Sequence, residues 1–191
     1  ISGSPLINSK GVRIRHDFDG REHFDKIIDA WELDKYTDGN SMERPLPRIV
    51  GKLTRKYRAK YPSKRIISHF MQPHAPFLAY KKSKLHQFVD FIKAGLNYIN
   101  LINKKFDPLE SIAIRKGKPF LQSLYKKNLQ IVLGEVKKTV KRLPDEKIVI
   151  TSDHGELLGE DGFYWHSGIE RMRNFDHPIL RKVPWLEVDK S

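Results

Sequence analysis

The chain has 191 residues, of which 39% are hydrophobic and 31% are charged, and its formal net charge at pH 7 is +13. This composition favours a globular protein over a disordered one, and the length suits one domain with a hydrophobic core. The chain has no cysteine, which excludes disulfides, thiolate metal sites and a cysteine nucleophile within it. The absence of cysteine fits a cytoplasmic location or a thermophilic protein. The sequence shows neither a transmembrane run nor a signal-peptide pattern, and a targeting or membrane segment upstream of it is the alternative.

Hydrophobic periodicity and Pro/Gly punctuation predict helices and strands along the chain. In chain order they are a helix over 24–33, a basic helix over 45–61, a strand over 65–71, a helix over 83–96, a short helical piece after Pro108, a long helix over 121–143 and a strand over 147–152. A strand, a long helical crossover and a second strand form a βαβ unit. We therefore expect the two strands to lie parallel in one sheet, with their carboxyl ends at the same edge.

An Asp-His pair follows the second of these strands. The apolar run from Lys147 to Ile150 stops at Thr151-Ser-Asp-His-Gly155, which places Asp153 and His154 where open α/β sheets bind their ligands. A carboxylate oxygen and an imidazole nitrogen are both zinc ligands, and Gly155 would let the chain turn tightly beneath an ion. The alternative interpretation is an ordinary turn with a solvated Asp and a capping His.

Three further histidines are candidates for the same site. The strand over 65–71 carries His69 and runs into His74, which lies between two prolines and so has a stiff backbone on either side. His166 follows His154 by twelve residues, after a Phe-Tyr-Trp run. His69 fits a core histidine almost as well as a ligand, and His166 could instead pack on the aromatic residues.

Other polar residues near these motifs receive structural interpretations. His177 stands before Pro178 and is more typical of a turn than of a site, so it is a second-tier candidate together with His69. Glu156 and Glu160 are interpreted as capping or solvating a short helix rather than transferring protons.

The motifs in this order resemble those of a known superfamily. The segment Ser152-Asp-His-Gly-Glu-Leu-Leu-Gly-Glu-Asp-Gly-Phe-Tyr-Trp-His166 resembles the C-terminal metal motif of the alkaline phosphatase superfamily, in its branch of sulfatases and phosphoethanolamine transferases. His69-Phe-Met-Gln-Pro-His74 is similar to the upstream strand of that branch, and Leu180-Arg-Lys-Val-Pro-Trp185 resembles its late strand. The resemblance covers residues 65–80 and 147–187 well and the residues between them loosely.

The resemblance implies a fold and a chemistry. The implied fold is a three-layer α/β/α sandwich with a mostly parallel sheet, present here as one partial domain over 1–191. Asp153 and His154 would hold a divalent metal ion, zinc in the first place and calcium, manganese or magnesium otherwise. His74 and His166 would face the group being transferred. The implied substrates are anionic: small molecules, lipids or glycans that carry a sulfate or phosphate ester.

The implied active site is incomplete in this chain. The branch carries a nucleophile in the pattern Cys/Ser-x-Pro-x-Arg, and Ser2-Gly-Ser-Pro5 does not match it. We therefore expect the chain to be the C-terminal portion of a larger protein, with no nucleophile of its own. The alternative function is a catalytically inactive module that binds anions or partners and keeps the metal half-site and the basic surface.

The excess positive charge is concentrated in residues 52–64 and 115–142. It fits a solvated helical face, or a field that attracts anionic substrates towards the site. Nucleic acid is a third option for these segments, although the sequence carries no strong nucleic-acid-binding motif.

Overall fold

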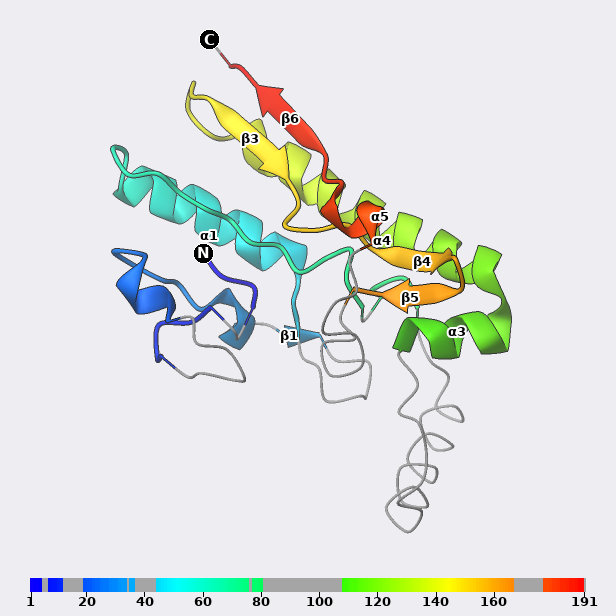
Figure 1. The fold of residues 1–191 in the computed structure, drawn as a ribbon. Coiled ribbons are helices and arrows are strands. Elements are labelled where there is room, and N and C mark those ends of the chain that lie inside the picture. Colours follow the sequence, from blue (N-terminus) through cyan, green and yellow to red (C-terminus); the bar gives the residue numbers. More distant parts are fainter. Residues whose placement is uncertain are drawn as a thin grey trace. The chain divides into compact units, whose positions relative to one another are not determined.

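The computed structural model describes residues 1–4, 7–11, 19–33, 35–36, 44–75, 77–80, 108–166 and 177–190 (Figure 1). The chain divides into two units. The first comprises Ile1–Gln87 and Lys126–Leu143, and the second comprises Phe88–Tyr125 and Pro144–Ser191. The long helix α4 (Lys118–Val140) contributes residues to both.

In the first unit, the predicted basic helix is confirmed as α1 (Pro47–Lys60). Proline at its first position costs no helical hydrogen bond, because the N–H there would have no partner within the helix. Val50, Gly51 and Thr54 form its buried face. The Thr54 hydroxyl donates to the Val50 carbonyl at 2.8 Å and lies 2.7 Å from the Ser68 hydroxyl, which ties α1 to the segment that follows it.

The predicted long helix is confirmed as α4, and its second half packs on α1 within the first unit. The guanidinium of Arg55 donates to the Thr139 hydroxyl at 3.0 Å and to the Glu135 carboxylate at 3.4 Å. Gly51 allows this approach, because a Cβ atom at that position would lie only 2.5 Å from the Thr139 hydroxyl oxygen. The remaining elements of this unit are the 3₁₀ turns η1 (Gly20–Glu22) and η2 (Ala30–Glu32) and the short strands β1 (Lys35–Tyr36) and β2 (Arg44–Pro45).

The second unit combines helices with two sheets, each made of two antiparallel strands. Its elements are α3 (Pro108–Lys116), the first turns of α4, β3 (Ile148–Thr151), β4 (Leu157–Glu160), β5 (Phe163–Trp165), α5 (Pro178–Arg181) and β6 (Trp185–Val188). Strand β3 pairs with β6 and β4 pairs with β5, both antiparallel (Figure 1). The predicted short helix after Pro108 and the predicted strand over 147–152 are thus confirmed as α3 and β3.

The predicted three-layer sandwich with a mostly parallel sheet is wrong. Within the described ranges, each sheet is a two-stranded antiparallel ladder. The expected βαβ partner of β3, residues 65–71, forms only an isolated bridge from His69 to Ser2. The partner that β3 does take is β6, because Trp185–Val188 offers a complete antiparallel ladder to Ile148–Thr151. An apolar run identifies a strand, but it does not identify the strand beside it.

The predicted helix over 24–33 is also wrong. The backbone there is bonded to the start of the chain: Ser2 N–H donates to the Ile28 carbonyl and Ala30 N–H to the Ser2 carbonyl, each at 2.9 Å. Those groups cannot serve a helical ladder at the same time, so apart from η2 the segment is not helical. The helix predicted over 83–96 lies outside the described residues. Among the helices that the structure describes, none combines the length and apolar character that a bilayer crossing requires.

Candidate metal centre

The segment that carries the predicted metal site folds as a turn followed by a β-hairpin. The hairpin loop consists of Asp161 and Gly162, with φ angles of 49° and 78°. Positive φ at two consecutive loop residues suits the tight turn of a two-residue hairpin, and Asp-Gly is one of the pairs that adopt it most readily. This loop pairs Glu160 with Phe163, and a register shift between Leu158 and Glu160 sets how the rest of β4 pairs with β5.

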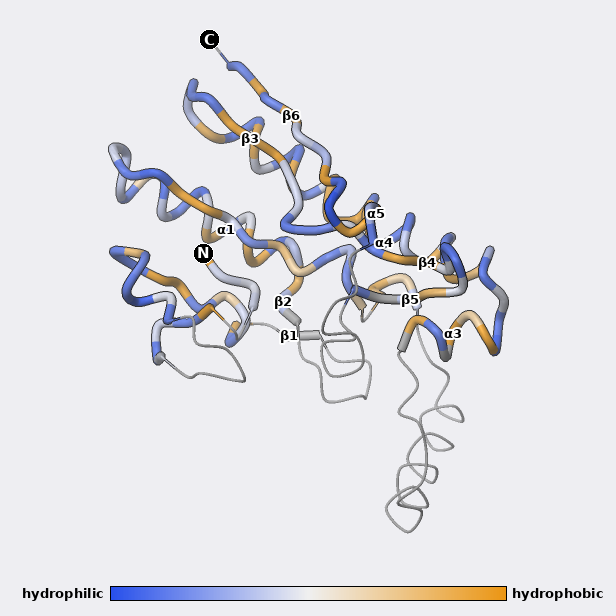
Figure 2. The backbone as a smooth tube through the Cα atoms, viewed as in Figure 1, coloured by the Kyte–Doolittle hydropathy of each residue, from blue (hydrophilic) through white to orange (hydrophobic). Residues whose placement is uncertain are grey.

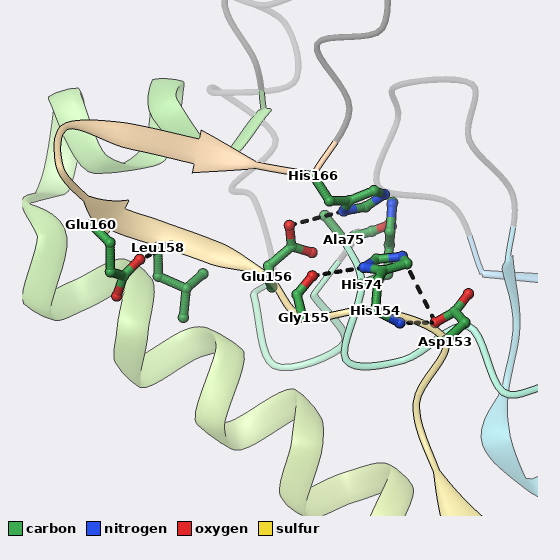
Figure 3. Close-up of polar contacts among 9 residues, drawn as sticks. All are labelled: His74, Ala75, Asp153, His154, Gly155, Glu156, Leu158, Glu160 and His166. Atoms are coloured by element: carbon green, nitrogen blue, oxygen red, sulfur yellow. Dashed lines mark hydrogen bonds and ion pairs between the residues drawn. The ribbon is translucent and has the colours of Figure 1, made fainter. Parts of the chain in front are cut away.

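The hairpin register sets Glu156 across from His166. Leu157 pairs with Trp165 and Leu158 with Tyr164 in the antiparallel ladder. Continuing that ladder by one step brings the residue before Leu157 opposite the residue after Trp165. Oε1 of Glu156 lies 2.9 Å from Nδ1 of His166 (Figure 3).

The Glu156–His166 pair is largely buried, with 6% of the Glu156 side chain and 18% of the His166 side chain exposed. An ionised carboxylate can only accept a hydrogen bond, so Nδ1 of His166 carries the proton that is shared with Glu156. When the ring is neutral, Nε2 is then the nitrogen with the free lone pair. A carboxylate bonded to the far nitrogen of an imidazole is the arrangement that orients metal-binding and catalytic histidines.

Asp153 and His154 form the turn between β3 and the hairpin. The backbone N–H of His154 donates to Oδ1 of Asp153 at 3.1 Å, and Nδ1 of His154 lies 2.7 Å from the Gly155 carbonyl oxygen. A carbonyl accepts only, so Nδ1 carries the proton and Nε2 has the lone pair. Nε2 lies 3.7 Å from Oδ1 of Asp153 (Figure 3).

The donor atoms of Asp153 and His154 fit one metal ion. Zinc binds carboxylate oxygen and imidazole nitrogen at about 2.1 Å, so two ligands of one ion lie about 3 to 4 Å apart. The separation of 3.7 Å falls in this range. Within the described ranges, however, no group of three or more His, Asp or Glu side chains is gathered to hold an ion. Asp153 and His154 therefore form a two-ligand arrangement, which we call the half-site.

His166 lies directly beside the half-site. The rings of His154 and His166 have centroids 4.1 Å apart and are tilted by 36°. The turn and the hairpin thus bring together Asp153, His154 and His166, three of the predicted site residues, in one unit.

Gly155 anchors the turn to α5. Its N–H donates to the Leu180 carbonyl at 2.9 Å. A Cβ atom at this position would lie 2.0 Å from the Ile179 carbonyl oxygen, so no larger residue fits without a backbone shift. The sequence predicts glycine here for a tight turn, and the structure adds a second reason, the close approach of two backbone segments.

Tyr125 of α4 is the titratable neighbour of these carboxylates within the second unit. Burial raises the pKa of its phenol to about 12, and the negative charges of Glu156 and Asp153 contribute in the same direction. The phenol therefore stays protonated throughout the physiological pH range, and it can act only as a neutral hydrogen-bonding group.

The second-tier residue His177 has a structural role. It is the N-cap of α5, where its Nδ1 accepts from the Ile179 N–H at 3.2 Å, and its Nε2 lies 3.2 Å from Oδ2 of Asp161. These contacts link α5 to the hairpin loop. The side chain is 13% exposed and serves packing and capping rather than a solvated turn.

The other two predicted site residues, His69 and His74, belong to the first unit. The His69 backbone bonds to the start of the chain through Ile1 and Gly3, at 3.0 Å each. The Nδ1 atom of His74 forms a short hydrogen bond with the Ala75 carbonyl. Asn128 of α4, which is fully buried, donates to the His74 carbonyl at 3.3 Å and thereby holds the loop.

Glu156 is the residue that sequence reasoning missed. The sequence predicts that Glu156 caps or solvates a short helix, but it directly precedes strand β4 and its carboxylate is buried against His166. The signal that could have found it is the Asp-Gly pair at 161–162 between two short apolar runs, which predicts a hairpin. Glu160, the other carboxylate of this stretch, accepts from the Leu158 N–H at 2.6 Å within the hairpin.

Comparisons of the chain with protein-family models, with curated proteins and with solved structures found no match. The resemblance to the alkaline phosphatase superfamily therefore stays a prediction, which rests on the motif residues 69–74 and 152–166.

Proposed function

We propose that Asp153 and His154 bind a divalent metal ion, zinc in the first place, in a site that hydrolyses or transfers sulfate or phosphate esters. The observation that supports the proposal best is the half-site, whose two donor atoms lie 3.7 Å apart, with the His166 ring 4.1 Å from that of His154. Calcium, manganese and magnesium are the alternative ions, and all three prefer oxygen ligands to imidazole.

The proposed chemistry assigns a distinct task to each residue. Asp153 and His154 would hold the ion, which would supply positive charge to activate a nucleophile and to balance the charge on the ester oxygens. His166 would contact the ester group through Nε2, as a proton donor or acceptor. Glu156 would keep His166 in the tautomer that this task requires. His74 is proposed for the ester group on the resemblance alone.

The half-site by itself is short of the three or four protein ligands that a tight zinc site uses. We therefore propose that further ligands and the nucleophile come from residues outside the half-site. The chain of residues 1–191 alone is expected to bind zinc weakly and to hydrolyse neither aryl sulfates nor aryl phosphates. Robust turnover by this chain would contradict the proposal, because it would require a nucleophile that we have not identified.

Calorimetric titration with zinc tests the half-site directly. Asp153→Asn removes the charged ligand and should weaken zinc binding by at least about tenfold. Mutation of a residue that only hydrogen-bonds to a metal ligand already costs about that much in metal affinity. Asp145→Asn is the matched control, since Asp145 is similarly exposed, lies in the same unit and only approaches Lys190 at 3.9 Å. Equal zinc affinity in the wild type and in both variants would exclude the half-site.

The same titration separates the enzyme from the alternative, an inactive anion-binding module. Phosphate or sulfate that binds without zinc, and equally well to the Asp153→Asn variant, would support the alternative. Anion binding that requires zinc and is lost in that variant would support the ester-processing site.

A further inference from the structure

A row of cations runs along the outer side of α1. Arg48, Lys52, Lys56 and Lys60 are spaced four residues apart, and all four are exposed. Residues four apart on a helix are neighbours, with a rise of about 6 Å from one to the next. Helix α1 contains no acidic residue, so this ridge brings like charges together. We call these four residues the α1 ridge.

The other two cations of α1 have structural partners. Arg55 bonds to Thr139 and Glu135 of α4. Arg58 donates to the carbonyls of Pro62 and Lys64, at 2.9 and 3.0 Å, beyond the end of the helix.

The lysines of the ridge, in contrast, have no such role. Among the residues that the structure describes, Lys52, Lys56 and Lys60 form no ion pair with a carboxylate. The amines of Lys56 and Lys60 lie over the rings of Tyr57 and Tyr61, at 5.7 Å from each ring centroid. The two tyrosine rings stack with their centroids 6.1 Å apart. The cation–π contact of each amine with its ring holds the lysine side chain in place without neutralising its charge.

The end of α4 and the turn after it add to this field. Lys137 and Lys138 of α4 and Lys141 and Arg142 just beyond it are exposed. They flank Thr139, through which α4 contacts α1 in the same unit.

A lipid surface is the poorer match for the ridge. Helices that lie in a membrane interface insert an apolar face into it. The apolar side of α1 is covered, because Val50 and Gly51 are buried within the protein. Hydrophobic and hydrophilic residues are mixed along this helix (Figure 2), and all of its exposed residues except Ala59 are basic.

We propose that the α1 ridge binds the phosphodiester backbone of a double-stranded nucleic acid, without reading its sequence. Duplex DNA carries one charge per about 1.7 Å of its axis, the kind of dense linear charge that a straight row of cations complements. Three of the four ridge residues are lysines, which bind phosphates as point charges and do not demand a particular orientation. This binding is separate from the half-site and does not depend on a metal ion.

Two triple variants of the full chain test the proposal. Lys52→Gln/Lys56→Gln/Lys60→Gln removes three charges from the ridge while keeping helix propensity, since Gln and Lys are similar helix formers. Lys116→Gln/Lys147→Gln/Lys182→Gln removes three charges from the second unit. Both variants lower the net charge of +13 by the same amount, so a difference between them reports the position of the charges. The probe is a 25-base-pair DNA duplex of random sequence, with binding followed by fluorescence anisotropy over a range of salt concentrations.

The ridge variant should bind the duplex at least tenfold more weakly than the wild type in low salt, and the control variant less than about threefold. The slope of log K against log salt should become shallower by about 2.7 in the ridge variant, because each lost phosphate contact contributes about 0.9. Circular dichroism of both variants verifies that the helices remain. Equal weakening in the two variants would overturn the proposal in favour of unspecific charge attraction. Tighter binding to phosphatidylserine vesicles or to a sulfated polysaccharide than to the duplex would overturn it in favour of those ligands.

Discussion

Oε1 of Glu156 accepts a hydrogen bond from Nδ1 of His166 at 2.9 Å, on two side chains that are both largely buried. The two residues meet because the hairpin loop at 161–162 and the register shift between Leu158 and Glu160 together set the pairing of β4 and β5. The pair therefore follows from local structure and does not require a large sheet. This explains how the motif segment can keep an ordered histidine although the predicted parallel sheet is absent from the described residues.

Replacing Glu156 should release the His166 ring. In Glu156→Ala we expect a mixture of the two neutral tautomers, because the carboxylate that accepts from Nδ1 is then missing. Glu156→Gln is the conservative control, since its amide oxygen can still accept the Nδ1 hydrogen bond. Long-range ¹H–¹⁵N correlation spectra of the histidine rings report the tautomer directly. Glu156→Ala should also lower the free energy of unfolding by about 1–3 kcal/mol, because it leaves a buried donor without its partner. An unchanged tautomer in Glu156→Ala would show that another contact orients the ring.

Zinc should stabilise the wild type but not Asp153→Asn. A ligand that binds only the folded state at 100 times its dissociation constant raises the free energy of unfolding by about 2.7 kcal/mol. The Asp153 side chain is 70% exposed, so without zinc the variant should unfold within about 0.5 kcal/mol of the wild type. Thermal unfolding with and without zinc measures both effects.

His177→Ala should have the opposite effects to those of Asp153→Asn on stability and on the response to zinc. A turn residue would tolerate this change, but the structure shows that His177 is the N-cap of α5, and loss of a cap costs about 0.5–2 kcal/mol. This variant should be less stable and yet keep its response to zinc. If it loses the zinc response while Asp153→Asn retains it, the ligands have been assigned to the wrong residues.

The raised pKa of Tyr125 predicts a pH dependence of stability. The folded pKa of about 12 lies above the ordinary value of 10.0, so the protonated phenol is favoured by folding. This contribution to stability is complete below pH 10 and is lost as the pH rises towards 12. Urea unfolding from pH 9 to pH 11.5 should therefore show a steeper loss of stability in the wild type than in Tyr125→Phe. Absorbance of tyrosinate at high pH should show a late-titrating tyrosine that is missing from the variant.

The sequence predicts individual elements better than their pairing. Helices α1 and α4 are recognised from their stripes and prolines, because a helix satisfies its hydrogen bonds within one segment. Strand β3 is recognised as well, but its partner is a segment almost forty residues away that no local pattern specifies. The same limit explains the missing helix over 24–33, whose periodicity is overridden by bonds to Ser2.

The residues of the site also fall into those that the sequence predicts and those that only the structure reveals. Asp153, His154 and His166 are found from their residue types and spacing, and the structure brings them together in one unit. The role of Glu156 depends on the hairpin register and that of His177 on the start of α5, so residue type alone misleads for both. Interactions that depend on register become visible only when the turn that sets it is identified.

Gly155 and Gly134 differ in the space that surrounds them. Gly155→Ala would place a Cβ atom 2.0 Å from the Ile179 carbonyl oxygen, and a backbone oxygen cannot move aside as the tip of a side chain can. We expect the variant to lose about 1–3 kcal/mol of unfolding free energy, the usual cost of overpacking. It should also bind zinc more weakly, because the turn that carries Asp153 and His154 is displaced.

Gly134→Ala is the control. Gly134 lies inside α4, and a Cβ atom there would meet nothing within 4 Å. Alanine at this position should stabilise the helix by about 0.5–1 kcal/mol. Urea unfolding gives both values, and calorimetry with zinc gives the effect on the half-site. If Gly155→Ala is as stable as the wild type and binds zinc equally well, the turn does not pack against α5 as described, and the half-site must be held in another way.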